Sequence, residues 1–319
     1  MERWMKEFVA HEIEKAYGMK IWATLPMRSV VGLATDHGRF ICKRYGKKQG
    51  LSFERIKALV ALKDQLALRG LCPSYARTRM GSGYVEFDGD VLTLEPWIAG
   101  KHADFSVRAD RMRAVQAVAR LHHAQIDVPM RFQNGQSLIQ KFLFRLRKAT
   151  EVVESGELMG LSYKEWEVYR DHAEHVLRNL PQEELRLLTK KHRSKGVLCH
   201  RDLAPHNILV QAGTPAVLID FDLAGSDSPL YDLHQIFDHM IYRTGSLNWV
   251  DETLYAYLLI HPLALQEQKL LRQLLEFPTP LLREIGELQE ASTLRAKKRV
   301  AMRIRYVNRL TQERLHACT

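Results

Sequence analysis

Residues 197–222 read VLCHRDLAPHNILVQAGTPAVLIDFD, and this stretch contains the strongest structural and chemical signal in the chain. It contains two short apolar runs on either side of a turn with Gly213, a pattern that predicts two strands joined as a hairpin. Asn207 precedes the first strand and Asp220 follows the second, so the hairpin brings these two side chains near each other. Asp202 lies on the loop just before the hairpin, and we expect all three side chains to converge on one point.

Three oxygen-bearing side chains at one point suit a hard cation such as Mg²⁺ together with an alcohol nucleophile. Phosphoryl transfer depends on positioning and on neutralising the charge of the transferred group. In that chemistry Asn207 and Asp220 bind the metal, while Asp202 orients an acceptor hydroxyl and takes its proton. The sequence therefore predicts an ATP- and Mg²⁺-dependent phosphotransferase with a catalytic loop at residues 200–207 and a metal-binding segment at 220–222.

Such an enzyme also needs a cation for the nucleotide phosphates. Lys43 is the candidate, because it lies on the third strand predicted in the N-terminal part, residues 39–45. A carboxylate should hold this lysine in place, and Glu54, early in the following predicted helix, is expected to do so. Lys43 and Glu54 therefore join Asp202 in the predicted catalytic set.

The loop predicted to cover the phosphates contains few glycines. Protein kinases have GxGxxG there, whereas residues 27–33 read MRSVVGL, with Gly32 as the single glycine. We expect backbone N–H groups and the Ser29 hydroxyl to contact phosphates at this loop. Trp97, in the connector that follows the N-terminal strands, either contacts adenine or packs in the core.

Residues 1–96 alternate strand and helix signals, including a hairpin turn at Asp36-His37-Gly38 and a long helix over residues 51–69. Residues 97–319 are mostly helical apart from a few short strands around the hairpin. We therefore predict an α+β fold with two lobes: a β-rich nucleotide-binding lobe (1–96) and a mostly helical C-terminal lobe (97–319) with a small catalytic β-hairpin. Clefts between two lobes are favoured ligand sites.

In their order along the chain, these features resemble the aminoglycoside phosphotransferase/choline kinase superfamily, which has a protein-kinase-like fold. The matching features are Lys43, Glu54, a hinge near Leu94–Trp97, the HRDLAPHN loop, the DFD segment and the run SPLYDL at 228–233. The resemblance implies transfer of phosphate from ATP to a hydroxyl group of a small molecule. It also implies that Asp232 supports the catalytic loop without reacting, the alternative being an exposed helix cap.

Three less specific motifs resemble sequences of the CotS family of bacterial spore-coat proteins: LEPWIAG at 94–100, LHHA at 121–124 and the DFD–PLYDL ending. This similarity implies a kinase of the mother-cell cytoplasm or spore coat, with other coat proteins as partners. It leaves a second interpretation open, a structural coat component that keeps the kinase fold without turnover. The complete set of Lys43, Asp202, Asn207 and Asp220 favours the enzyme.

The segment between Asp220 and Asp232 distinguishes the chain from protein kinases. It spans only 12 positions and no A-P-E motif follows, so no peptide-docking platform is predicted. The helical region 137–192 is expected to form the acceptor wall instead. On its first helix three cations share one face by spacing, where they either contact an anionic substrate or stay solvated: Lys141, Arg145 and Lys148.

Composition excludes several other classes. Of 319 residues, 46% are hydrophobic and 26% charged, which rules out a disordered, collagenous or coiled-coil chain. No apolar run approaches the ~18 residues of a membrane span, and four scattered cysteines are typical of reduced thiols in the cytoplasm. The net charge of +10 permits nucleic-acid binding, but no stacking-aromatic or finger motif supports it. Near the C-terminus, Val300, Ile304 and Val307 predict a docked basic helix with an apolar stripe.

Overall fold

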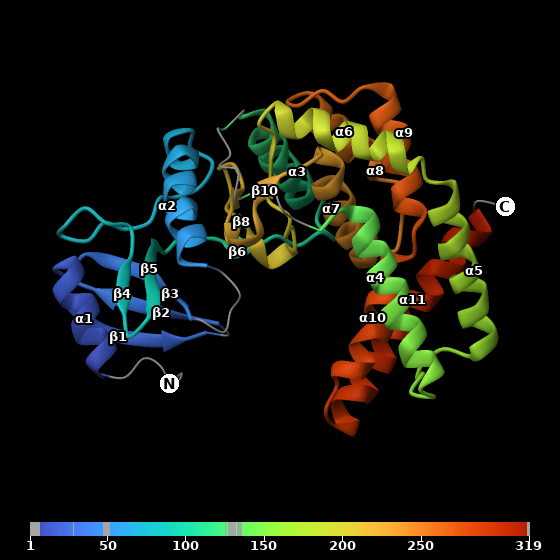
Figure 1. Cartoon of the computed structure of the whole chain (residues 1–319), viewed down its shortest axis with the longest axis horizontal. Helices are drawn as coiled ribbons and strands as arrows, with labels where there is room; N and C mark the ends of the chain where they lie inside the picture. The colour runs from blue at the N-terminus through green and yellow to red at the C-terminus, as the bar shows by residue number, and fades with distance from the viewer. Residues whose placement is uncertain are drawn as a thin grey trace.

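A computed structural model describes residues 7–27, 29–46, 52–124, 126, 132 and 136–317. Its N-terminal sheet and its helical C-terminal part lie side by side, the sheet on the left of Figure 1 and the helices on the right. The predicted α+β architecture is confirmed, because strands dominate up to Pro96 and helices dominate after it. The division into lobes of residues 1–96 and 97–319 stays a prediction.

The N-terminal sheet has five antiparallel strands in the order β1-β2-β3-β5-β4 within the described residues. They are β1 (Ile21–Pro26), β2 (Val30–Thr35), β3 (Gly38–Tyr45), β4 (Val85–Phe87) and β5 (Asp90–Pro96). Turns that contain Gly38 and Gly89 join neighbouring strands, and both glycines have the positive φ that such turns require. The register places Lys43 in the interior of β3, opposite Val30 of β2 and Thr93 of β5.

Two helices accompany this sheet. Helix α1 (Glu7–Tyr17), which was not predicted, packs Ile13 and its apolar neighbours against the sheet. Helix α2 (Phe53–Leu68) begins at Ser52, whose hydroxyl accepts a hydrogen bond from the Arg55 N–H at 3.2 Å. The inward face of α2 belongs to the large core that it shares with the C-terminal helices. Helix α2 therefore links the two parts of the molecule.

The C-terminal part consists of helices packed around that shared core, with short strands at the edge that faces the sheet. The helices are α3 (Arg108–His123), α4 (Leu138–Glu154), α5 (Tyr163–Asn179), α6 (Gln182–Ser194), α7 (Pro229–Thr244), α8 (Val250–Leu258), α9 (Leu265–Glu276), α10 (Thr279–Glu290) and α11 (Leu294–Ala317). The strands are β6 (Lys101–His102), β7 (Leu198–Cys199), β8 (Ile208–Val210), β9 (Val217–Leu218) and β10 (Gly225–Ser226). Within the described residues, no helix has both the length and the apolarity needed to cross a bilayer.

The predicted hairpin is the pair β8–β9. These strands are antiparallel, with Ile208 opposite Leu218, and β6 pairs with the other edge of β8. At the open end of the hairpin the Ile219 N–H donates to the Asn207 carbonyl at 3.0 Å. This hydrogen bond brings the residues that precede β8 next to those that follow β9.

The C-terminal helix α11 is docked on the protein. The side chains of Val300, Ile304 and Val307 are buried in the main core, and α11 packs against α10. Met302, on the opposite side of the helix, is 60% exposed. The apolar stripe expected from the sequence is therefore confirmed.

Because Ile304 is fully buried, we expect Ile304→Ala to lower the free energy of unfolding by about 2–5 kcal/mol. Met302→Ala, on the exposed face of α11, should change the free energy of unfolding by less than about 0.5 kcal/mol. Urea unfolding of both variants measures these values. A small, equal effect of both substitutions would contradict the docking of α11.

Candidate active site

The Lys43 ammonium lies between two carboxylates of the DFD segment. It is 2.7 Å from Asp220 Oδ1 and 2.7 Å from Asp222 Oδ2. The Tyr45 hydroxyl, also on β3, donates to Asp222 Oδ1 at 3.0 Å. These contacts join strand β3 to the segment that follows β9, 177 positions later in the chain. The structure thus brings the predicted phosphate-binding lysine next to a predicted metal ligand.

The two carboxylates beside Lys43 have different environments. Burial alone would raise the pKa of Asp220, but the nearby Lys43 ammonium overrides burial and the pKa falls below its usual range. Burial holds the pKa of Asp222 above its usual range in spite of Lys43, and the charge of Asp220 adds to that effect. The Asp220 side chain is also the more exposed, 41% against 19%. Asp220 therefore has the lower pKa of the two acids and is the more accessible one.

The backbone of Asp220 has a conformation that is rare for a residue with a side chain. Its φ is 64°, in the left-handed region, which costs about 1–3 kcal/mol unless the surroundings enforce it. Arg55 of α2 contributes to that enforcement, since its guanidinium donates to the carbonyls of Asp222 and Ala224 at 2.9 Å each. The sharp turn after β9 lets both acids reach the same ammonium.

The catalytic loop is tied to the open end of the hairpin. The Asn207 amide nitrogen donates to the Asp202 carbonyl at 2.9 Å and to Asp202 Oδ2 at 3.0 Å. His200 Nε2 donates to the Ile219 carbonyl at 2.8 Å, so His200 Nδ1 is the acceptor for the Asp202 N–H at 3.3 Å. The Asp202 carboxylate is therefore held in a fixed direction and stays half-buried.

The oxygen atoms at this point fit a hard divalent cation. The amide nitrogen of Asn207 is engaged by Asp202, and no donor within the described residues bonds to its Oδ1. Asp220 Oδ1 contacts Lys43, and Asp220 is ionised, which leaves carboxylate and amide oxygens available. Such oxygens are the ligands that Mg²⁺ prefers. The oxygen donors of Asn207 and Asp220 therefore fit the predicted metal. Their assignment as metal ligands stays a prediction.

Asp232 supports the catalytic loop through hydrogen bonds to its backbone, as the family resemblance implied. Its buried carboxylate accepts hydrogen bonds from the backbone N–H of His200 at 2.6 Å and of Arg201 at 2.8 Å. His122 Nε2 lies 3.0 Å from the same carboxylate. The alternative of a helix cap is wrong, because Ser228 caps α7. These bonds hold Arg201 at a φ of 67°, a second strained position beside Asp202.

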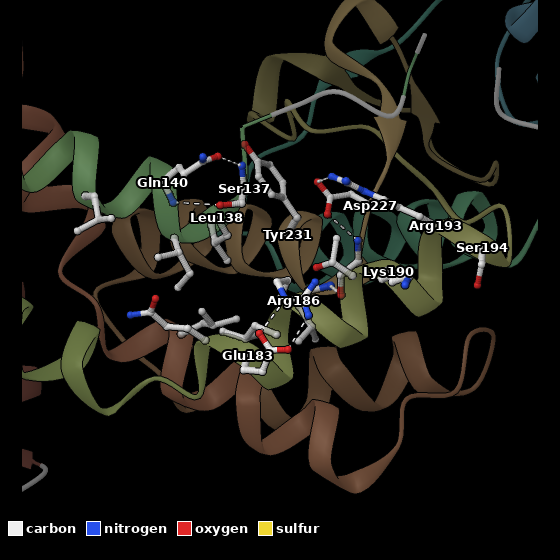
Figure 2. Close-up of a pocket in the computed structure, with 18 residues that line it drawn as sticks. Ser137, Leu138, Gln140, Glu183, Arg186, Lys190, Arg193, Ser194, Asp227 and Tyr231 are labelled. Atoms are coloured by element: carbon white, nitrogen blue, oxygen red, sulfur yellow. Dashed lines mark hydrogen bonds and ion pairs between the residues drawn. The ribbon is translucent and has the colours of Figure 1, made fainter. Parts of the chain in front are cut away.

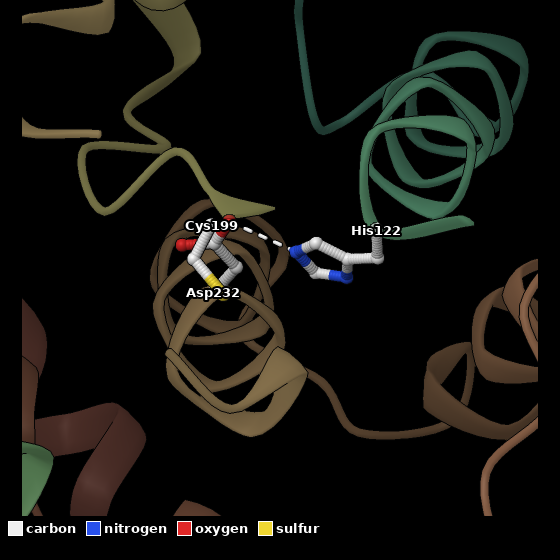
Figure 3. Close-up of side chains that lie close together, drawn as sticks. All are labelled: His122, Cys199 and Asp232. Atoms are coloured by element: carbon white, nitrogen blue, oxygen red, sulfur yellow. Dashed lines mark hydrogen bonds and ion pairs between the residues drawn. The ribbon is translucent and has the colours of Figure 1, made fainter. Parts of the chain in front are cut away.

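His122, Cys199 and Asp232 lie close together and buried, from α3, β7 and α7 respectively (Figure 3). Their polar atoms are engaged by the protein: Cys199 Sγ donates to the Ser228 carbonyl at 3.3 Å, and His122 Nδ1 lies 2.6 Å from the Tyr257 hydroxyl. Burial raises the pKa of the Cys199 thiol well above its usual range, and a protonated thiol is a poor metal ligand. This cluster is a hydrogen-bonded support for the catalytic loop.

Glu54 does not hold Lys43 in this structure, so the predicted Lys43–Glu54 pair is wrong here. The Glu54 side chain is 64% exposed and pairs with Lys57, one turn further along α2, at 3.7 Å. The inward face of α2 is set by residues such as Ile56, and Glu54 lies two positions earlier, about 200° around the helix. Helix phase therefore turns Glu54 outward, and Asp222 occupies the position beside Lys43 that was expected for it.

A buried ion pair behind the site was not predicted. Lys63 of α2 is 1% exposed and lies 2.6 Å from Glu95 at the end of β5. Its ammonium also lies over the ring of Tyr75, whose hydroxyl is 3.3 Å from that of Tyr45. The available signal was the position of Lys63 within the apolar face of α2, where a lysine needs a buried partner. This chain of contacts connects the hinge strand to the tyrosine that bonds Asp222.

The Trp97 indole packs against strand β2 at Gly32. A Cβ on Gly32 would lie 3.2 Å from Trp97 Cζ3, so the glycine allows the indole to pack against the strand. Ser29 is exposed at the turn before β2. The neighbouring Arg28 lies outside the described residues. Contacts of Ser29, Gly32 and Trp97 with a nucleotide stay predictions.

A separate cavity of about 960 Å³ lies between α4, α6 and the start of α7 (Figure 2). Basic side chains of α6 line one wall, among them Arg186 and Lys190, and Tyr231 of α7 lies at the centre of the view. Asp227 connects this cavity to the catalytic loop, because it pairs with Arg201 at 2.7 Å. None of the predicted site residues lines it, so it adjoins the candidate site without containing it.

Comparisons with known proteins identify curated relatives and a solved structure with a similar fold. Two curated relatives are homoserine kinases, from Methylobacillus flagellatus (24% identical over 73% of this chain) and from Beijerinckia indica (29% over 72%). The chain spans 66% of the length of each of these relatives. A crystal structure of an aminoglycoside phosphotransferase from Alicyclobacillus acidocaldarius superposes with a TM-score of 0.76 at 16% identity, covering 96% of this chain and 93% of the other.

The family model described as the phosphotransferase enzyme family matches residues 28–271. This span includes every predicted site residue, from Ser29 to Asp220, and strands β2 to β5 together with most of the C-terminal helices. The protein therefore belongs to the phosphotransferase enzyme family.

Proposed function

We propose that the protein transfers the γ-phosphoryl group of ATP to a hydroxyl group of a small-molecule acceptor, with Mg²⁺ as the metal. The observation that carries this proposal is the convergence of Lys43, Asp202, Asn207 and Asp220, which come from both lobes, around the open end of the β8–β9 hairpin. These are the charges and oxygen ligands that phosphoryl transfer requires.

Each residue has a separate role in the proposed reaction. Lys43 binds the nucleotide phosphates, and Asn207 and Asp220 hold the metal. When bound, Mg²⁺ neutralises charge on the phosphate oxygens. Asp202 accepts the proton of the acceptor hydroxyl while that oxygen forms its bond to the γ-phosphorus. The bond from this phosphorus to the bridging oxygen breaks, and ADP leaves with the electron pair.

The named relatives make a hydroxyl-bearing amino acid the first acceptor to test. The placement among spore-coat kinases, with coat proteins as partners, is part of this proposal and rests on the motifs at 94–100 and 121–124. The alternative is a coat component with a kinase fold and no turnover. The retained site residues support the enzyme over that alternative.

Asp202→Asn removes the proposed base and keeps the size of the side chain. We expect phosphoryl transfer to fall by about 10²–10⁴-fold, because a positioned base contributes that much. Nucleotide binding, measured as ATP-dependent thermal stabilisation, should be unchanged. The control is Asp171→Asn, at an exposed carboxylate that pairs with Arg170 on the surface of α5. Equal low rates in wild type and Asp202→Asn across a panel of alcohols would favour the non-catalytic coat component.

Asp220→Asn tests the metal assignment, because asparagine tolerates the left-handed backbone that Asp220 adopts. We expect the extra thermal stabilisation by ATP that depends on Mg²⁺ to be lost, since one anionic ligand becomes neutral. Asp88→Asn is the matched control, because Asp88 is exposed in the β4–β5 turn and also has positive φ, 52°. An unchanged Mg²⁺-dependent shift in Asp220→Asn would show that Asp220 is not a ligand.

A further inference from the structure

Both oxygens of the Asp222 carboxylate are engaged by side chains of strand β3. Asp222 Oδ2 lies 2.7 Å from Lys43 Nζ, and the Tyr45 hydroxyl donates to Asp222 Oδ1 at 3.0 Å. Lys43 and Tyr45 are two positions apart on β3, so their side chains leave the same face of the sheet. The terminal torsion of an aspartate has only a weak preference of its own. The Tyr45 hydroxyl therefore fixes the plane of the carboxylate and the direction in which its other oxygen meets the lysine.

The Tyr45 hydroxyl is itself held in place. Its side chain is 3% exposed and packs with Ile56 of α2 and Val91 of β5. Its hydroxyl lies 3.3 Å from the hydroxyl of Tyr75. A tyrosine hydroxyl has one proton, and Tyr45 donates it to Asp222, so Tyr75 is the donor in the contact between the two tyrosines. The hydrogen bonds thus run in one direction, from Tyr75 through Tyr45 to Asp222.

A buried ion pair lies behind the two tyrosines. The Lys63 ammonium lies 4.2 Å from the centre of the Tyr75 ring and 2.6 Å from Glu95 Oε2. Tyr75 and Lys63 are only 2% and 1% exposed. Lys63 belongs to α2 and Glu95 to β5, the strand that pairs with β3. The ammonium, itself fixed by Glu95, thus holds the ring that carries the first hydroxyl of the chain.

Packing alone does not require these polar groups. Apolar side chains of similar volume would fill the same space without the desolvation cost of a buried ion pair, and such replacements are often neutral or stabilising. Hydrogen bonds add direction, because they weaken steeply when they are bent. A chain of hydrogen bonds that ends at the carboxylate beside Lys43 is suited to fixing the direction of that carboxylate.

We propose that Tyr45 and Tyr75 are positioning residues of the candidate active site, which hold Asp222, and through it Lys43, where the lysine meets the nucleotide phosphates. The inference rests on the proposed phosphotransferase function, because that function gives Lys43 its ligand. In this role neither tyrosine reacts. Both act through Asp222, which takes the place of the carboxylate expected from α2.

The first test removes single oxygen atoms from this chain. Tyr45→Phe keeps the ring that packs in the core and loses the hydrogen bond to Asp222. We expect the Kd for ATP, measured by calorimetric titration in excess Mg²⁺, to rise about 3- to 10-fold, the range of one lost hydrogen bond. Tyr75→Phe should raise this Kd by less, because the Tyr45 hydroxyl still donates to Asp222.

The matched control is Tyr17→Phe. Tyr17 of α1 is also buried, but it belongs to the apolar cluster that contains Cys42, on the face of β3 opposite to Lys43. Loss of its hydroxyl should leave the Kd for ATP at the wild-type value.

A double-mutant cycle with Lys43→Met distinguishes positioning from a general loss of structure. If Tyr45 acts through the lysine, Tyr45→Phe has no further effect on the Kd for ATP once residue 43 is no longer a lysine. A general disturbance of the fold would weaken ATP binding by the same factor in both backgrounds.

The outcomes separate this inference from the proposed function. If Tyr45→Phe has the wild-type Kd, or if its loss of affinity persists unchanged in the Lys43→Met background, the positioning role is refuted while the phosphotransferase stands. If wild type binds no ATP, the proposed function fails and the positioning role fails with it. A loss of affinity in Tyr45→Phe that disappears in the Lys43→Met background and is absent from Tyr17→Phe supports the inference.

Discussion

A single ammonium between two carboxylates connects the parts of this protein. Lys43 reaches from the middle of the N-terminal sheet to Asp220 and Asp222, and the other parts of the candidate site are placed relative to that contact. Strand β3 adds the hydroxyl of Tyr45, and α2 adds the guanidinium of Arg55. Charge-assisted hydrogen bonds of this kind are about twice as strong as neutral ones. The segment 220–224 is therefore the point at which the N-terminal sheet and helix α2 meet the C-terminal part.

The same site contains most of the backbone strain in side-chain-bearing residues. Within the described chain, Arg201 and Asp220 are two of the three non-glycine residues with positive φ. Arg201 directly precedes Asp202, and Asp220 is itself one of the converging acids. Each conformation costs about 1–3 kcal/mol and persists only where surrounding contacts enforce it. For Arg201 the enforcing group is the buried carboxylate of Asp232, and for Asp220 it includes the contact with Lys43. The left-handed backbone at Arg201 and Asp220 directs the side chains of Asp202 and Asp220 to positions that an extended backbone would not give them.

Local patterns predicted much of this architecture. The positions of glycines in turns predicted the hairpins correctly. The positions of Asp202, Asn207 and Asp220 around the β8–β9 hairpin predicted that their loops converge, because a tight turn brings the two ends of a hairpin together. Glu54 was predicted to pair with Lys43, but Asp222 does so in the structure. Pairing between segments that are far apart in the sequence depends on how the N-terminal sheet packs against the C-terminal part. The apolar phase of α2 contained the needed signal: it turns Glu54 outward and Lys63 inward toward Glu95.

The most direct test of phosphoryl transfer follows the γ-phosphoryl group itself. ATP whose γ-phosphoryl group carries three non-bridging ¹⁸O atoms is incubated with the protein, Mg²⁺ and a hydroxyl-bearing amino acid such as L-homoserine, and the acceptor is analysed by mass spectrometry. We expect a phosphorylated acceptor that retains all three labelled oxygens, formed by the wild-type protein and not by a variant that lacks the Asp202 carboxylate. Label found only in inorganic phosphate, at the same rate with and without the Asp202 carboxylate, would show that the protein does not transfer phosphate to this acceptor.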